Sequence, residues 1–332
     1  PGFCAESADL LTDAGRHDLC CFFREFLWQV AEQRPMSASI PAIRWSAPTY
    51  DPPLPPAVAR GGKGRIVVIS DAGPDDHNLL RMIDRFERSV PLPVERLNLA
   101  ELRMDGGCLG CMRCADDGLC NYRDDYASAF DQQVRPADVV IYAGAVRDRY
   151  LSARFKTFLD RYFCNGHRPL DRPQAMGFII SGPLGQLATL KQILEAHVQL
   201  FRSRRLGIVT DEDPNSEGIT QRLEGLALAA ERWTADPWFD PPTFLGVGGV
   251  KVFRDLVYDN RGLLSADHRY YRAHGLYDWP QTKRTGKWWF MTLALLIKRI
   301  PFLRRRADKL LLQGKMRSFH QMLQAQSGPK GA

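Results

Sequence analysis

The chain has 332 residues, of which 45% are hydrophobic and 25% charged. These values are ordinary for a soluble globular protein with a buried core, and the length allows one large domain or two smaller ones. No apolar run reaches the roughly 18 uncharged residues of a membrane-spanning helix, and no basic-then-apolar leader opens the sequence. We therefore expect a cytoplasmic protein.

The net charge of +7 is unevenly distributed along the chain. Residues 281–332 contain twelve Lys and Arg and one acidic residue, a net charge of +11, so the preceding residues carry −4. The body is mildly acidic and the tail is strongly basic. This asymmetry bears on binding partners and says nothing about the fold.

The first 60 residues are predicted to form a helical extension and a linker. Within residues 1–45, apolar side chains recur at helical spacing, which is typical of a packing face: Phe22, Phe23, Phe26, Leu27 and Val30. Residues 46–56 contain five prolines, and three glycines follow within residues 61–64. This composition predicts an extended linker that leads into the main domain.

Short apolar runs alternate with helical patterns between residues 61 and 240, which we predict to be one α/β domain. The predicted strands are 65–70, 94–99, 138–142, 177–180 and 206–210, and the predicted helices are 78–88, 124–134, 152–163, 189–202 and 217–233. This alternation predicts a parallel sheet with right-handed crossovers and with helices on both faces. Five such strands fit the flavodoxin-like order, whose ligand binds beyond the carboxyl ends of the strands.

Residues 241–332 follow this domain. Residues 241–280 are rich in aromatic residues and turns, and we predict an irregular appendage that covers the domain or contacts another subunit. Residues 288–297 are an apolar stretch of about ten residues, too short to span a bilayer, and a basic cluster follows at 298–306. We predict that residues 285–312 form a basic helical tail. It either lies on an anionic membrane surface, on the inner face, or docks on the body or on another subunit. Nucleic acid binding is not expected, because large aliphatic residues accompany the basic ones.

Eight cysteines occur, and four of them fall in one thirteen-residue window: Cys108, Cys111, Cys114 and Cys120. Such clustering in a cytosolic chain indicates metal ligation or redox chemistry, whereas the scattered cysteines are predicted to be ordinary thiols. Three cysteines spaced three residues apart, followed by a fourth, can surround one iron–sulfur cluster, and neighbouring glycines let the backbone bend around it. The spacing predicts a four-iron four-sulfur cluster. Structural zinc, which usually takes two separated pairs, and unligated redox thiols are the alternatives.

The remaining titratable residues give no further site. Five scattered histidines show no metal-ligand spacing and are predicted to be surface or hydrogen-bonded core residues: His77, His167, His197, His268 and His274. Asp160 and Arg161 are predicted to form an internal ion pair at a helix end. No individual catalytic acid or base can be named.

With these elements in place, the chain resembles the iron–sulfur flavoproteins of the flavodoxin-like NAD(P)H-dependent FMN reductase group over about residues 63–235. The resemblance is carried by the four-cysteine loop, by Asp124-Asp125, by the strand Ala137-Asp138-Val-Val-Ile, and by Ser152-Ala-Arg-Phe-Lys156-Thr-Phe-Leu-Asp160-Arg161. It implies an electron-transfer oxidoreductase in which FMN and a four-iron four-sulfur cluster exchange electrons across a subunit contact of a homo-oligomer. NAD(P)H, ferredoxin or, if the tail reaches a membrane, a quinone would be the redox partner.

The resemblance also places the FMN in three loops. Its phosphate would bind in the loop of residues 70–78, with Ser70, Gly73 and Asn78 as contacts, because a loop that feeds a helix N-terminus suits an anion. The flavin ring would contact a second and a third loop, at Ala145, Val146, Arg147, Tyr150, Ser181 and Gly182.

Two of these loops depart from the pattern of the relatives. Asp75 and Asp76 stand where relatives have basic or Ser/Thr residues, and they would repel a phosphate unless they turn outward and cap the next helix. The second loop carries Arg147 and lacks the usual ring-side aromatic residue, for which Tyr150 is the substitute. The alternative function is therefore a non-enzymatic binding or assembly protein, with a flavodoxin-like shell that has lost FMN and keeps a structural metal or cluster.

Overall fold

The computed structural model describes residues 9–33, 43–46, 48–52, 55, 58–59, 61–167, 172, 174–238, 241, 243–277 and some positions between 296 and 321. The chain comprises two units. The first consists of Pro1–Ala42, Leu109–Met112 and Gly286–Ala332, and the second of Ile43–Cys108 and Arg113–Thr285.

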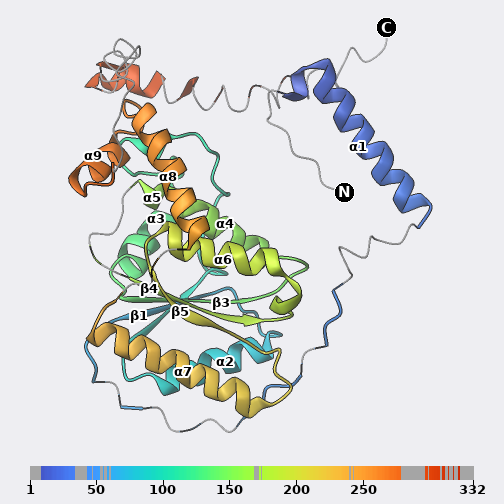
Figure 1. Ribbon diagram of the computed structural model, residues 1–332, viewed down its shortest axis with the longest axis vertical. Helices are drawn as coiled ribbons and strands as arrows, with labels where there is room; N and C mark the ends of the chain where they lie inside the picture. The colour runs from blue at the N-terminus through green and yellow to red at the C-terminus, as the bar shows by residue number, and fades with distance from the viewer. Residues whose placement is uncertain are drawn as a thin grey trace. The chain divides into compact units, whose positions relative to one another are not determined.

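The second unit is built on a five-stranded parallel sheet (Figure 1). Its strands are β1 (Ile66–Ser70), β2 (Val94–Asn98), β3 (Val139–Ala145), β4 (Ala175–Ser181) and β5 (Arg204–Thr210). They lie in the order β2-β1-β3-β4-β5, and every neighbouring pair is parallel. This is the flavodoxin-like order. The predicted fold class is confirmed.

Helices cover both faces of the sheet, as Figure 1 shows. One face carries α2 (His77–Ser89) and α7 (Ser216–Ala235), and the other carries α3 (Tyr126–Ala129), α4 (Ala153–Arg161), α5 (Phe163–Gly166) and α6 (Ala188–Leu200). The predicted helix at 124–134 is α3 followed by a π-helical turn, Phe130–Val134. The predicted helix at 152–163 is α4, with α5 directly after it.

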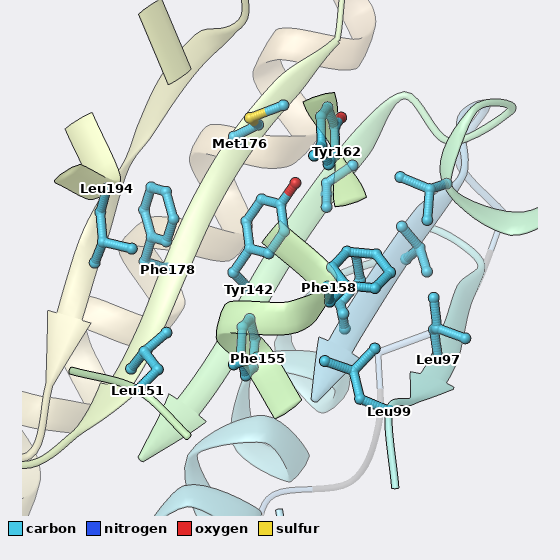
Figure 2. Close-up of a cluster of buried hydrophobic side chains, with 14 of the residues drawn as sticks. Leu97, Leu99, Tyr142, Leu151, Phe155, Phe158, Tyr162, Met176, Phe178 and Leu194 are labelled. Atoms are coloured by element: carbon cyan, nitrogen blue, oxygen red, sulfur yellow. The ribbon is translucent and has the colours of Figure 1, made fainter. Parts of the chain in front are cut away.

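The two faces of the sheet bury separate cores. Along β1, Ile66 and Val68 belong to the core beneath α2 and α7, whereas Val67 and Ile69 belong to the other. Successive side chains of a strand point to opposite faces, so a strand covered on both sides reads as one continuous apolar run. Figure 2 shows the second core, in which Tyr142 of β3 stacks on Phe178 of β4 with 5.5 Å between ring centroids.

The predicted irregular appendage is helical instead. It forms α8 (Phe244–Asp259), which packs against α6, and α9 (Ser265–Ala273), which packs against the turn Arg113–Ala115 of the cysteine loop. The glycines at 246, 248 and 249 lie inside α8. Glycine is a poor helix former, which is why this helix is hidden in the sequence.

The first unit contains α1 (Asp13–Ala31), which confirms an N-terminal helix. The Thr12 side chain caps it by accepting the Gly15 N–H at 2.9 Å. No residue of α1 is buried within the described residues, and Phe22 of the predicted packing stripe is half-buried.

The membrane prediction for residues 285–312 falls largely outside the described residues, where only 296–297, 299–306 and 309–310 of that range are placed. In the described part of the chain, every helix is too short or too polar to cross a bilayer.

Candidate functional site

The predicted ligand cysteines lie in a loop that links β2 to α3. In the second unit, Cys108 is exposed, Cys114 is buried and Cys120 is half-buried. Cys111 belongs to the short segment Leu109–Met112 of the first unit. Within that segment Gly110 and Met112 have φ values of 60° and 58°. Both values lie in the left-handed region, which costs a methionine about 1–2 kcal/mol.

Arg161, at the end of α4, closes the base of the cysteine loop. Its side chain is 1% exposed, that of Asp124 is 0% exposed, and the two form a bidentate ion pair at 2.8 and 2.9 Å. Arg161 also donates to the Gly106 carbonyl at 3.1 Å, and Asp124 accepts the Asp105 N–H at 2.9 Å. The chain that enters the loop is thereby tied to the chain that leaves it.

Tyr122 adds a second tie at the same place. Its hydroxyl donates to the Gly107 carbonyl at 3.1 Å, and the Arg161 guanidinium lies 4.2 Å from the centroid of its ring. The same guanidinium lies 4.7 Å from the ring centroid of Tyr126, which is fully buried. A desolvated cation over aromatic rings adds up to about 2 kcal/mol to such an anchor. The ends of the loop are therefore fixed before any ligand binds.

The ion pair is ionic in the folded protein. Burial alone would raise the pKa of Asp124, but hydrogen bonds from Arg161 and from the Asp105 backbone lower it overall. Removal of either partner would leave the other as an uncompensated buried charge, which is strongly destabilising.

The pKa of the Cys120 thiol is lowered to about 5. The main cause is a hydrogen bond from Cys164, and the Tyr122 backbone N–H and the Arg161 charge add to it, against the opposing effect of burial. The pKa of Cys164 is raised, because it donates this hydrogen bond to Cys120 and because it is buried. The lowered pKa favours the thiolate form of Cys120, and the thiolate is the form that ligates iron and zinc.

This loop has the donor chemistry of a metal or cluster site, since four thiols fall in thirteen residues and the pKa of one of them is lowered. Across the described residues, however, no three His, Cys, Asp or Glu side chains stand close enough together to hold a metal ion. Ligation by the four cysteines therefore stays a prediction.

In the predicted phosphate loop, residues 70–78, side chains of the loop itself accept hydrogen bonds from its backbone N–H groups. The Gly73 N–H donates to the Asp76 carboxylate at 2.9 Å, and the Ala72 N–H donates to Ser70 Oγ at 3.1 Å. Asp76 also accepts Arg147 at 2.6 and 2.8 Å. Asp76 directly precedes α2 but makes no capping hydrogen bond with its side chain, so the predicted outward capping role is wrong. The carboxylate turns into the loop, where a phosphate would have to bind.

Asn78, a predicted phosphate contact, anchors the linker. Its Nδ2 donates to the Pro48 carbonyl at 2.8 Å and to Asp211 at 3.0 Å, and its Oδ1 accepts the Tyr50 N–H at 3.0 Å. These bonds join the segment before β1 to α2 and to the residue that follows β5.

In the third loop, which follows β4, carboxylates likewise accept the hydrogen bonds of the loop's donors. Ser181 Oγ and the Gly182 N–H each donate to the buried Asp211 at 2.7 Å, and the Gly185 N–H donates to Glu212 at 2.9 Å. Gly182 has φ +123°, and a Cβ there would lie 2.7 Å from the Val146 Cβ. The second and third loops approach closely only because this residue is glycine.

The second loop is a tight turn at the end of β3. Ala145 is buried, and the Arg147 N–H donates to the Tyr150 carbonyl at 2.7 Å. Tyr150 is half-buried against the core, and burial raises the pKa of its phenol. The structure thus brings the predicted flavin-site residues together at the carboxyl edge of the sheet. Asp71, Asp76, Asp211 and Glu212 accept the hydrogen bonds of the donors around them, and these loops do not fit a phosphate.

Sequence reasoning missed three features of these sites. Arg161 pairs with Asp124 and Asp160 with Lys156, so the predicted Asp160–Arg161 pair is wrong. Adjacent residues of a helix point in different directions, and the spacing should have argued against it. Cys164 is buried beside Cys120, and Asp211 fills the third loop; nothing in the local sequence signals either.

No family model matches this chain. A stretch of 106 residues is 33% identical to a curated protein of Archaeoglobus fulgidus, a match that covers 31% of this chain and 47% of the relative. That relative is an iron–sulfur flavoprotein. The predicted resemblance is confirmed as a distant similarity that spans about half of the relative.

Solved structures with similar backbones include an azoreductase from Bacillus anthracis, with 13% identity, a TM-score of 0.37 and coverage of 51% of this chain and 99% of the azoreductase. An NADH:FMN oxidoreductase has 13% identity, a TM-score of 0.36 and coverage of 51% of this chain and 89% of the oxidoreductase. The fold assignment itself rests on the strand order and register described above.

Proposed function

We propose that this protein is an electron-transfer oxidoreductase whose redox centre is a four-iron four-sulfur cluster held by Cys108, Cys111, Cys114 and Cys120. The observation that carries the proposal is the buried Arg161–Asp124 pair, which fixes both ends of the four-cysteine loop. Burying an ion pair costs free energy because both charges lose their hydration. A loop whose two ends are held rigidly suits the presentation of several thiolates to one cluster. The distant similarity to an iron–sulfur flavoprotein supports the same assignment.

A bound cluster would supply one-electron transfer, at a potential set by charge and by hydrogen bonds to its sulfurs. The residues of this chain contribute those two influences. Arg161 places a positive charge beside Cys120, and Cys164 donates a hydrogen bond to the Cys120 sulfur. Both stabilise negative charge on the thiolate, and both would raise the reduction potential of a ligated centre.

FMN is the second centre that the similarity suggests, and the loop geometry opposes it. Gly73, Gly182, Gly185 and Arg147 would have to give up carboxylate partners before they could bind a phosphate. The redox partners, whether NAD(P)H, ferredoxin or a quinone, stay predictions, as do the homo-oligomer and the membrane contact of residues 285–312.

The test is to purify the full chain without oxygen and to measure iron, sulfide, zinc and flavin on one sample. We expect about four iron and four sulfide per chain, with broad visible absorption that dithionite bleaches. Cys114→Ser should lose the iron, whereas Cys20→Ser, at an exposed position on α1, should keep it. Stoichiometric zinc without iron would overturn the proposal.

The loops predicted to bind flavin have their donors bonded to carboxylates. This favours a second candidate function, a binding or assembly protein that keeps only a structural metal. The two candidates differ in the metal analysis. Zinc without flavin supports the assembly protein, and iron with reversible bleaching supports the oxidoreductase. Flavin released on denaturation would show that the carboxylates at 76 and 211 move aside.

A further inference from the structure

A cavity of about 650 Å³ lies in the second unit, away from the loops discussed above. Its walls come from α4, α5 and α6, from α8 and α9, and from the segments that precede β3 and β4. The cavity therefore adjoins the amino edge of the sheet, whereas flavodoxin-like proteins bind their ligand at the carboxyl edge. We propose that this cavity binds an aromatic carboxylic acid, whose ring enters the cavity and whose carboxylate pairs with Arg202 at the rim.

The interior of the cavity is lined mainly by aromatic rings: Phe130, Tyr162, Phe163, Phe201, Phe253 and Tyr271. His197 lies among them, with its ring centroid 4.7 Å from that of Tyr162 and 4.9 Å from that of Phe201. Burial lowers the pKa of His197 to about 4, which favours the neutral ring. The volume falls within the range of about 300–1,000 Å³ in which small-molecule sites are found. Such walls stack on a planar ring.

The charges in the wall leave one guanidinium available. Four charged side chains of the wall have partners among the described residues: Arg135 with Asp131, Asp160 with Lys156, Arg172 with Asp138, and Asp267 with His167. Arg202 is exposed, and in the described part of the chain it forms no ion pair. A guanidinium presents a planar fork of N–H donors that matches the two oxygens of a carboxylate.

Aromatic side chains hold Arg202 close to the opening of the cavity. Its guanidinium lies 5.9 Å from the ring centroid of Tyr270, which is within the range of a cation–π contact. Burial raises the pKa of the neighbouring Tyr271 phenol, and the Arg202 charge opposes that rise. The positive charge is therefore near two rings of the wall. A ligand with its ring inside the cavity could place a carboxylate against it.

The backbone at Arg202 gives an independent reason to assign its side chain a role. The Arg202 N–H donates to the Gln199 carbonyl at 3.1 Å, and the Ser203 N–H donates to the Val198 carbonyl at 3.0 Å. These two hydrogen bonds close the end of α6, and Arg202 has a φ of 52°. Glycine usually occupies this left-handed position, because a Cβ is unfavourable there. A guanidinium that binds a ligand accounts for an arginine where glycine would be more stable.

The test is a calorimetric titration of the full chain with 2-naphthoate and with 2-naphthamide, which keeps the ring and shape of the acid but carries no charge. We expect 2-naphthoate to bind about tenfold more tightly, because only the acid forms a charge-assisted pair with Arg202. Equal or tighter binding of the amide would overturn the proposal, and so would the lack of saturable binding by 2-naphthoate. The binding does not depend on a cluster, so it can fail or succeed independently of the proposed function.

Arg202→Gly separates ligand binding from folding. The variant relieves the left-handed backbone, so the midpoint of urea unfolding should stay the same or rise. The preference for 2-naphthoate should fall to about threefold or less. Arg205→Gln is the matched control, because it removes a nearby charge that is paired with Glu195 at 2.8 Å and lies outside the wall. It should keep the preference. An unchanged preference in Arg202→Gly would overturn the assignment of Arg202.

A second pair of variants locates the ring. Val250 lines the cavity from α8, and Val250→Trp should fill part of it and weaken the binding of both ligands at least about tenfold. Val252, on the same helix, is 69% exposed and outside the wall, so Val252→Trp should bind both ligands as the unaltered chain does. Unweakened binding by Val250→Trp would contradict a site in this cavity. If Val250→Trp does not fold, the comparison of Arg202→Gly with Arg205→Gln decides.

Discussion

Carboxylates act differently in two regions of the molecule. One region is the base of the cysteine loop, and the other is the set of loops at the carboxyl edge of the sheet. At the base, the Asp124 carboxylate meets the Arg161 guanidinium, and the pair ties together the two chain segments that enter and leave the loop. At the edge, four carboxylates bind the backbone N–H groups and side chains that a phosphate would need. A loop can therefore bind a phosphate only where neighbouring side chains leave its backbone donors unoccupied.

The largest expected effect tests the base of the loop. Arg161→Met leaves Asp124 buried and unpaired, and we expect a loss of about 3–5 kcal/mol in the free energy of unfolding, measured in urea. Lys156→Met, on the same helix, removes an exposed ion pair with Asp160 and should cost less than about 1 kcal/mol. Similar losses for the two variants would mean that Arg161 does not clamp the loop.

The next effect tests the ionisation of Cys120 in metal-free protein. With a pKa of about 5, this thiol is a thiolate at pH 6 and becomes protonated only as the pH falls below 5. Its rate of alkylation by iodoacetamide, followed by peptide mass spectrometry, should hardly change between pH 8 and pH 6. An ordinary thiol of pKa near 8.5 would slow by roughly 80-fold.

Cys164→Ala is the matched control for that measurement. It removes the main cause of the lowered pKa, so the alkylation of Cys120 should then fall with decreasing pH in the way of an ordinary thiol. An unchanged profile would show that Arg161 and the backbone suffice.

A smaller effect tests the carboxyl edge. Asp211 is fully buried and accepts hydrogen bonds from Ser181, Gly182 and Asn78. Asp211→Asn should lower the free energy of unfolding by about 1–3 kcal/mol, because an amide cannot accept all three. Asp75→Asn, at an exposed position in the first loop, should stay within about 0.5 kcal/mol of the unaltered chain.

The smallest expected effect tests whether a carboxylate is what prevents FMN from binding at the carboxyl edge. Asp76→Ala frees the Gly73 N–H and the Arg147 guanidinium, so FMN affinity, measured by quenching of flavin fluorescence, should rise about tenfold. Asp75→Ala removes a charge from the same loop without freeing these donors and should change affinity by less than about threefold. Tight FMN binding by the unaltered chain would show that the carboxylates are no obstacle.

Much of the fold could be predicted from the sequence because its signals are local. The apolar runs at 65–70 and 138–142 became β1 and β3, since a strand covered on both faces needs uninterrupted apolar residues. Helix α8 escaped prediction because its glycines oppose helix formation, and packing against α6 overrides that preference.

The sites divide in the same way. By itself the sequence determined the parallel α/β sheet and the four clustered cysteines, because periodicity and ligand spacing are properties of neighbouring residues. The tertiary structure alone decided which donors are already occupied and where a cavity lies. Arg161 meets Asp124 across 37 positions, Arg147 meets Asp76 across 71, and His167 meets Asp267 across 100. Such pairs form only when the sheet and its helices bring distant segments together, and burial then gives each pair its energetic weight.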